Sequence, residues 1–307
     1  MCCGLFVCAA AAQTNPLPAR TMERLLLTDA HRSGSRVVAV GDRGYIVVSD
    51  DEGRTWRRAG SPEAPLLTAV DFSADATGLA VGHDAVILAT SDGGKTWTQV
   101  FAAPAEQRPL LDVIHLSKDT AIAIGAYGAY YESADAGRSW NARKIIADDK
   151  HLNAILRVSD ARLLILGEAG TILASNDAGK TWTPVASPYK GSFFGGVVAA
   201  DGSVVAFGLR GRIYRSTDGG DTWTQVQNAS LAAIMSGERL PDGAIVLAGA
   251  AGTALVSRDN GQSFVPVETG TTRALAKAVL GAANQLLLLG EAGVRAVPLA
   301  TSARRAP

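Results

Sequence analysis

The stretch Thr90–Trp97, TSDGGKTW, occurs six times in this chain in closely related form. Each copy fits Ser/Thr-x-Asp-x-Gly-x-Thr/Ser followed by an aromatic residue, a motif called the Asp box below. Successive box aspartates are separated by 41, 43, 42, 41 and 41 residues, and every tryptophan belongs to a box. Such a regular period predicts a repeat architecture. The aspartates and aromatic residues are Asp51 and Trp56, Asp92 and Trp97, Asp135 and Trp140, Asp177 and Trp182, Asp218 and Trp223, and Asp259 and Phe264.

A second motif, Gly-x-x-Gly, precedes every Asp box, with Ala85 in place of the second glycine in one copy. A seventh copy, Gly290 and Gly293, has no box after it. Within one unit, such as residues 66–100, four short β runs alternate with turn residues, and helical periodicity is nowhere sustained. Four-stranded units of about 40 residues are typical of propeller blades. We therefore predict an all-β fold, a seven-bladed β-propeller over residues 13–300, followed by a tail at 301–307.

The seventh unit supplies only three β runs. Residues 14–20, TNPLPAR, occupy the place where a fourth strand lies in every other unit. We predict that this N-terminal segment forms the outer strand of the last blade and closes the ring, because closure removes an exposed sheet edge. Pro16 and Pro18 suit an outer strand, since they lack the N–H that a central strand needs. The alternative is a six-bladed ring with an extra hairpin.

The Asp box is interpreted as a structural turn. An Asp side chain in a turn accepts hydrogen bonds from backbone N–H groups, and the glycine two residues later permits a positive φ. The aromatic residue then returns the chain to the blade with a large apolar surface to bury. A calcium loop needs acids at several alternate positions and a closing Glu, whereas these boxes share one acid each. The six aspartates are therefore not nominated as catalytic.

Composition excludes several functional classes. Hydrophobic residues make up 47% of the chain and charged residues 19%, which is sufficient for a globular core. Lys plus Arg and Asp plus Glu both number 29, so no attraction to nucleic acid is expected. The four histidines fall in different units without metal-ligand spacing, and no phosphate-binding or nucleophile-elbow motif occurs. We predict no metal, no cofactor, no membrane span and a monomer.

Residues 1–12 contain all three cysteines and form a short apolar run that ends in small residues. This pattern is typical of a secretory signal peptide, although a basic n-region is missing. We therefore expect a periplasmic or secreted protein whose remaining chain can form no disulfide. The alternative is a cytoplasmic protein with an apolar N-terminus.

The combination of both motifs, as in GEAGTILASNDAGKTW (167–182) and GLRGRIYRSTDGGDTW (208–223), resembles the photosystem II stability and assembly factor family. That family belongs with the bacterial neuraminidase, or Asp-box, repeat proteins. The resemblance covers the whole chain beyond the leader. It implies a seven-bladed, non-enzymatic scaffold outside the cytosol that binds a protein client. In phototrophs such a protein holds a newly made reaction-centre subunit during assembly.

The residues between the paired glycines, called the tips below, vary while the scaffold does not. Variable loops on a repeated frame usually carry binding specificity. We predict that Arg43, His83, Tyr127 and Arg210 contact a protein partner, because Arg and aromatic anchors dominate interfaces. The resemblance further implies an arginine-rich docking patch, which Arg43 and Arg210 could continue. The alternative is that all four are solvated loop residues.

A sialidase-like glycoside hydrolase is the alternative function. Such an enzyme would resemble a six-bladed ring with a Phe-Arg-Ile-Pro motif, which this chain lacks. A pair of carboxylates could still be assembled from distant loops, and the tip acids available are Asp42, Asp84, Glu168 and Glu291. Because no unit carries a catalytic insertion, the sequence favours a binding scaffold.

Overall fold

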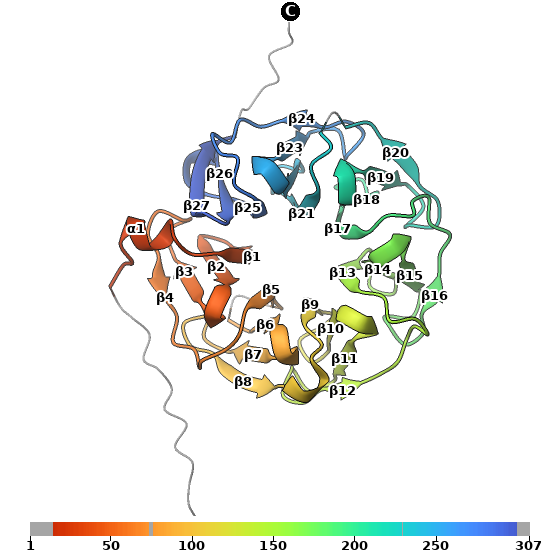
Figure 1. Cartoon of the computed structure of the whole chain (residues 1–307), viewed down its shortest axis with the longest axis horizontal. Helices are drawn as coiled ribbons and strands as arrows, with labels where there is room; N and C mark the ends of the chain where they lie inside the picture. Colours follow the sequence, from red (N-terminus) through yellow and green to blue (C-terminus); the bar gives the residue numbers. More distant parts are fainter. Residues whose placement is uncertain (1–14, 74–75, 229, 300–307) are drawn as a thin grey trace, which may run out of the picture.

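The computed structural model of the chain is a ring of sheets arranged radially around a common centre (Figure 1). The first strands of all seven blades line one central cavity, called the channel below. The structure describes residues 15–73, 76–228 and 230–299. Six of its sheets have four antiparallel strands and one has three. The predicted seven-bladed propeller is confirmed, and the six-bladed alternative is wrong. The predicted signal peptide at 1–12 and tail at 301–307 lie outside the described residues.

Each blade runs from the channel outward in chain order. Blade 1 is β1 (Leu27–Ser33), β2 (Arg36–Gly41), β3 (Ile46–Ser49) and β4 (Arg57–Arg58). Blade 2 is β5 (Leu67–Phe72), β6 (Gly78–Gly82), β7 (Ile87–Thr90) and β8 (Thr98–Phe101). Blade 3 is β9 (Leu110–His115), β10 (Ala121–Gly125), β11 (Tyr130–Ser133) and β12 (Asn141–Ala142). Blade 4 is β13 (Leu152–Arg157), β14 (Leu163–Gly167), β15 (Ile172–Ser175) and β16 (Thr183–Pro184).

The remaining blades repeat this order. Blade 5 is β17 (Phe193–Val198), β18 (Val204–Gly208), β19 (Ile213–Ser216) and β20 (Thr224–Val226). Blade 6 is β21 (Ile234–Arg239), β22 (Ile245–Gly249), β23 (Ala254–Ser257) and β24 (Val265–Pro266). Blade 7 is β25 (Leu275–Leu280), β26 (Gln285–Gly290) and β27 (Gly293–Pro298). A short helix α1 (Ala19–Met22) precedes blade 1, and 3-10 turns occur at η3 (Pro104–Glu106) and η8 (Ala282–Asn284).

The core is divided among the seams between neighbouring blades. The second strand of each blade is buried almost throughout, for example β14 with the sequence LLILG. Both faces of such a strand are covered by adjacent blades, which explains its continuous apolar run in place of an alternating one. The apolar clusters accordingly join blades. In one of them, Ile122 of blade 3 packs with Leu163 of blade 4.

The Gly-x-x-Gly motif permits two close approaches of backbone, as blade 5 illustrates. A Cβ on Gly208 would lie 2.2 Å from the carbonyl oxygen of Ser192, just before β17. A Cβ on Gly211, which has a φ of +65°, would lie 2.2 Å from the carbonyl oxygen of Ser230 in the linker to blade 6. Because the tip holds the next linker in this way, tips and linkers share one face of the ring, called the tip face below.

The Asp boxes lie on the opposite face, called the box face below, and form part of each seam. Gly220 of the blade 5 box has a φ of +95°, and a Cβ there would lie 2.5 Å from Cδ1 of Leu164 in blade 4. The box glycines of the other five boxes face an aliphatic side chain of the preceding blade in the same way. The box glycine therefore serves both the turn and the contact between blades.

Ring closure differs from the prediction. Within the described residues, the last sheet contains only β25, β26 and β27, and the N-terminal segment adds no strand to it. Instead, the N–H of Leu17 donates to the carbonyl of Trp56 in blade 1, at 2.6 Å. Pro16 and Pro18 leave Leu17 as the sole donor between them, and Pro18 then precedes α1 as its N-cap residue. The predicted outer strand is therefore wrong.

The N-terminal segment nevertheless covers the seam between blades 7 and 1. Met22 is buried and belongs to an apolar cluster with Leu27 of blade 1 and Leu289 of blade 7. Its carbonyl oxygen would lie 1.7 Å from a Cβ on Gly293. Among the described residues no strand is shared across this seam, and side-chain packing contributes to its closure.

Candidate protein-binding face

Six of the seven tips share one turn geometry. Each is a 3-10 turn whose middle residue has a left-handed backbone with φ between 52° and 58°. An L-residue in this region costs roughly 1–2 kcal/mol, and such strain concentrates where side chains must be held in a fixed position. The middle side chain therefore projects from a rigid turn. The turns are η1 (Asp42–Gly44), η2 (His83–Ala85), η4 (Ala126–Gly128), η5 (Glu168–Gly170), η6 (Leu209–Gly211) and η7 (Ala250–Gly252).

The four predicted contact residues all lie on exposed tips. Arg43, Tyr127 and Arg210 are middle residues, and His83 is the first residue of its turn. The side chain of Arg43 is 84% exposed, and its Nε lies 3.5 Å from Oδ2 of Asp42. Blades 1, 2 and 3 are neighbours, so the first three tips are consecutive around the ring (Figure 1). Arg210, on blade 5, lies across the channel from Arg43, and these two arginines do not form one patch.

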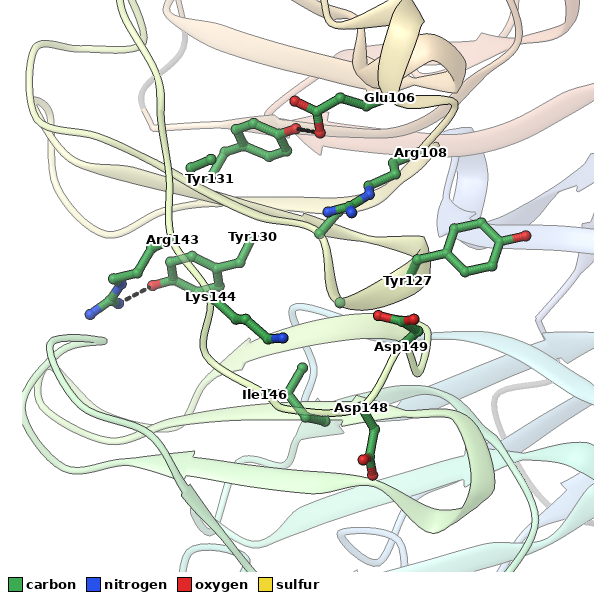
Figure 2. Close-up of a pocket in the computed structure, with 13 residues that line it drawn as sticks. Glu106, Arg108, Tyr127, Tyr130, Tyr131, Arg143, Lys144, Ile146, Asp148 and Asp149 are labelled. Carbon is green, nitrogen blue, oxygen red and sulfur yellow. Dashed lines mark hydrogen bonds between the residues drawn. The ribbon is translucent and has the colours of Figure 1, made fainter.

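Tyr127 stands at the edge of a polar cavity of about 220 Å³ on blade 3. Its ring is half exposed and meets the ring of His151 edge-on, with 5.0 Å between centroids. Figure 2 shows the cavity between the linkers on either side of blade 3, with Arg108 and Lys144 directed into it. The cavity thus brings together one tip and two linkers.

The tyrosines in this cavity are held neutral. The hydroxyl of Tyr131 donates to Glu106 at 2.7 Å, and burial together with this carboxylate raises the pKa of Tyr131. Burial also raises the pKa of Tyr130, whose hydroxyl accepts a hydrogen bond from Arg143 at 2.9 Å. The raised pKa values keep both phenols protonated at neutral pH.

The first strands of the blades line a central channel that contains partly buried charges. Nζ of Lys277 lies 3.1 Å from Oε2 of Glu238 and 3.5 Å from Oδ1 of Asp29, which links blades 6, 7 and 1. Burial alone would lower the pKa of Lys277, but attraction to the two carboxylates outweighs burial and raises it. Burial raises the pKa of Asp29 despite the neighbouring ammonium.

Two further channel carboxylates have opposite pKa shifts. Burial raises the pKa of Asp112 to about 7, although its oxygens accept hydrogen bonds from the backbone N–H groups of Ile155 and Val113. Burial would also raise the pKa of Asp71, but hydrogen bonds from His115 and His31 hold it well below its usual value. The Nδ1 of His115 lies 2.9 Å from Oδ2 of Asp71.

Sequence reasoning missed this charged channel. The sequence pattern that could have indicated the channel charges is a charged residue within the first strand of a blade. Asp29 in LTDAHRS and Lys277 in LAKAVL are examples. Adjacent residues of a strand point to opposite sides of the sheet, so a sequence without a register does not show which of them face the channel.

The four acids on the tips belong to four different blades. Asp42, Asp84, Glu168 and Glu291 stand on the tips of blades 1, 2, 4 and 7. The carboxylate of Glu168 accepts from the N–H of His151, at 3.1 Å, at the entry to its own blade. Glu291 is bound in the same way within blade 7.

The box aspartates accept hydrogen bonds from within their own turns. In blade 4, Oδ1 of Asp177 accepts from the N–H of Thr181 and the hydroxyl of Ser175, and Oδ2 accepts from the hydroxyl of Thr181. These bonds lower the pKa of Asp177 to about 2. Trp56, Trp97, Trp140 and Trp223 also donate to their box glycine carbonyls, whereas Trp182 points its Nε1 toward Tyr130.

Two kinds of site are absent from the described ranges. No group of three His, Cys, Asp or Glu side chains is arranged to hold a metal ion there. Over the same residues, no helix combines the length and the apolar character required to cross a membrane.

Solved structures of low sequence identity share this fold. A structure of YCF48 bound to D1 peptide aligns with a TM-score of 0.70 and 21% identity, covering 94% of both chains. YCF48 from Cyanidioschyzon merolae aligns at 0.69 and 20% identity, covering 93% of this chain and 97% of its own. The GH74 xyloglucanase from Xanthomonas campestris aligns at 0.70 and 14% identity, covering 89% of this chain and 52% of its own. Among curated proteins, no sequence matches this chain.

The fold and the repeated boxes define a seven-bladed propeller of the Asp-box repeat class. The sequence profile described as photosynthesis system II assembly factor YCF48 matches residues 99–264, slightly more than half of the chain. The chain therefore belongs to the YCF48 family of photosystem II assembly factors, as its paired motifs predicted.

Proposed function

We propose that this protein binds a segment of a client protein on its tip face and acts as an assembly scaffold without catalysis. The observation that carries the proposal is the set of chemically different side chains held out by one repeated rigid turn. The solved YCF48 homologue, which is described as bound to D1 peptide, is a precedent for a peptide client. We further propose that the client is part of a membrane-protein complex.

Two observations support a binding role over glycoside hydrolysis. The four tip acids stand on separate blades, and Glu168 and Glu291 already accept hydrogen bonds from their own blades. A hydrolase needs one raised and one ordinary carboxyl within about 5–10 Å of each other on either side of the bond. The similarity to a xyloglucanase is that of the fold, which many unrelated functions share.

Face-resolved photocross-linking tests the proposal. A photoreactive amino acid replaces Tyr127 or Arg210 on the tip face, and Arg138 or Lys180 on the box face as matched exposed controls. We expect adducts with the same membrane protein from both tip positions and from neither box position. Equal adducts from both faces, or none from the tips, would refute the proposed face. Release of reducing sugar from xyloglucan or a sialylated glycan by the purified protein would favour the hydrolase.

We also propose a periplasmic or secreted location and a monomeric state. The apolar leader supports the location. The location is tested by fractionating cells that express the tagged full-length chain. Mass spectrometry of the recovered protein shows whether the leader has been cleaved. Recovery of uncleaved protein from the cytoplasm would contradict this location, and light scattering would measure the mass in solution.

A further inference from the structure

Three of the six exposed large apolar side chains among the described residues lie on the tip face of blades 5 and 6. Leu231 is 78% exposed, Met235 43% and Leu209 39%. These three belong to the linker between the two blades, the first strand of blade 6 and the tip of blade 5. Exposed large apolar side chains that are scattered singly need no explanation, but a contiguous group marks a site of interaction.

The backbone contacts make this group contiguous. The linker that carries Leu231 packs on the tip that carries Leu209, since a Cβ on Gly211 would meet the carbonyl oxygens of Ser230 and Ala232 at 2.2 and 3.1 Å. The amide of Asn228 also donates to the carbonyl of Gly211, at 3.0 Å. Leu209, Leu231 and Met235 are called the apolar sector below.

The apolar sector continues into the mouth of the channel. Met235 and Phe194 line the same cavity of about 160 Å³, together with the glycines at 195, 196 and 237. Phe207 occupies the space beside these glycines, because a Cβ on Gly195 or Gly237 would lie 2.6 or 2.7 Å from its ring. The same cavity is lined by Asp29, Asp112 and Lys277, from blades 1, 3 and 7. A cavity of about 150 Å³ can hold a benzene ring, so the mouth has room for one large apolar side chain.

The exposed charges in the segments that surround the apolar sector on the tip side, 185–194, 208–212, 227–236 and 249–253, are all positive. Lys190, Arg210 and Arg212 are exposed and flank it, and none of them has an ion-pair partner among the described residues. The tip-side segments 185–194, 208–212, 227–236 and 249–253 contain no Asp or Glu. Acids on the tip face stand on the tips of blades 1, 2, 4 and 7, and Glu268 lies in the linker after blade 6. The uncompensated cations therefore favour a partner that brings carboxylates.

From these observations we infer that the apolar sector binds an extended client segment in which one large apolar side chain is flanked by acidic residues. The inference rests on the proposed function and names the chemistry of its client. The apolar side chain enters the channel mouth between Phe194 and Met235. The flanking carboxylates meet Arg210, Arg212 and Lys190. Met235 suits this role because its flexible thioether side chain adapts to different apolar partners.

Fluorescence anisotropy with defined peptides tests the inference on the full-length protein. The probe is a labelled 12-residue peptide with one Phe flanked by two Glu on each side in a Gly/Ser background. Its matched controls carry Gln for every Glu, or Ser for Phe. We expect the first control to bind at least about tenfold more weakly and the probe to lose affinity as salt rises, because the ion pairs are exposed.

Protein variants locate the site. Met235→Ser and Arg210→Ser should each weaken binding of the probe at least about fivefold. Val265→Ser removes a side chain of similar exposure, 48%, from the outer strand of blade 6, and Arg138→Ser removes an exposed arginine from the box face. Both controls should stay within twofold of wild type, with unchanged thermal unfolding in all four variants.

The outcomes separate this inference from the proposed function. Equal binding of the probe by wild type, Met235→Ser and Arg210→Ser, or no binding of it at 1 mM, overturns the apolar sector as its site. If cross-links from Tyr127 then persist, client binding stands and only the sector is wrong. If cross-links from every tip position are also absent, the proposed function fails as well.

Discussion

Nζ of Lys277 in the last blade lies 3.5 Å from Oδ1 of Asp29 in the first. This ion pair crosses the closure of the ring, where no strand is shared among the described residues. The two side chains are 16% and 20% exposed, so both charges are largely removed from water. Nearby packing of Met22 between blades 1 and 7 adds the apolar part of the closure. The ion pair and the N-terminal segment therefore both contribute to this seam.

Replacing Lys277 by Met should destabilise the protein strongly. The substitution keeps the stem but leaves Asp29 and Glu238 without their cation, and removal of one partner from a buried pair costs about 3–5 kcal/mol. Urea unfolding at pH 7 measures the loss. In a cycle with Asp29→Asn, the double variant should be more stable than the sum of the single losses predicts, by about 1 kcal/mol or more. Strict additivity would show that the pair does not hold the seam.

Arginine side chains connect several of the other seams, and Arg215 allows a direct test. Its Nε donates to the carbonyl of Asn260 in the next box at 2.8 Å, and its Nη2 donates to Asp201 at 2.7 Å. Arg215→Met should cost about 2 kcal/mol of unfolding free energy, since hydrogen bonds to charged groups contribute about 1.5–3 kcal/mol. The exposed Arg138 is the control, and Arg138→Met should change stability by less than about 0.5 kcal/mol. Equal effects of the two variants would contradict the role of Arg215.

Substitutions at two adjacent glycines can distinguish the cost of backbone strain from the cost of steric crowding between blades. Gly219 and Gly220 have φ values of +76° and +95°. A Cβ on Gly219 meets nothing closer than Nε of Arg162 at 3.9 Å, whereas one on Gly220 would lie 2.5 Å from Leu164. Gly219→Ala should cost about 1–2 kcal/mol from backbone strain. Gly220→Ala should cost about 1–3 kcal/mol more from overpacking. Thermal unfolding of both variants checks the order, and a smaller effect at Gly220 would be inconsistent with the tight contact.

The number of blades was predictable because each blade repeats its own turn chemistry. Residues such as Asp218, Gly220 and Trp223 form hydrogen bonds with residues only a few positions away. Contacts at such short separations are visible in the local sequence pattern. The closure was not predictable in the same way. Pro16 and Pro18 were compatible with an outer strand. The packing of α1 against blade 7, however, is a contact between residues far apart in the chain, which a local sequence pattern cannot indicate.

The candidate site was predictable only in part. Variation between paired glycines indicated Arg43, His83, Tyr127 and Arg210 as exposed tips, and the structure places all four on one face. It did not indicate that Arg210 lies beside Leu231 and Met235, because these residues are 21 and 25 positions away and meet through the linker. The charged channel depends on strand register across seven blades, which a single sequence does not supply.

The raised pKa of Asp112, about 7, makes the stability of the ring depend on pH near neutrality. The groups that face Asp112 are the N–H groups of Val113 and Ile155, the carboxylates of Asp29 and Asp71, and Lys277. In the unfolded chain an Asp titrates near 3.9. Between about pH 4 and pH 7 the folded state therefore binds more protons at this residue than the unfolded state does. By linkage, the contribution of Asp112 to stability falls as pH rises through this window.

The comparison with Asp112→Asn isolates this effect, because the amide is neutral at every pH. We expect the unfolding free energy of wild type, relative to the variant, to fall by up to about 1.4 kcal/mol per pH unit between pH 4 and 7, and to level off above that. Urea unfolding at pH 5, 6, 7 and 8 measures the difference, and Asp148→Asn, at an exposed linker carboxylate, serves as the control. A difference that stays constant across this range would mean that Asp112 is already ionised at pH 5. In that case burial in the channel does not outweigh the two backbone hydrogen bonds that favour its charged form.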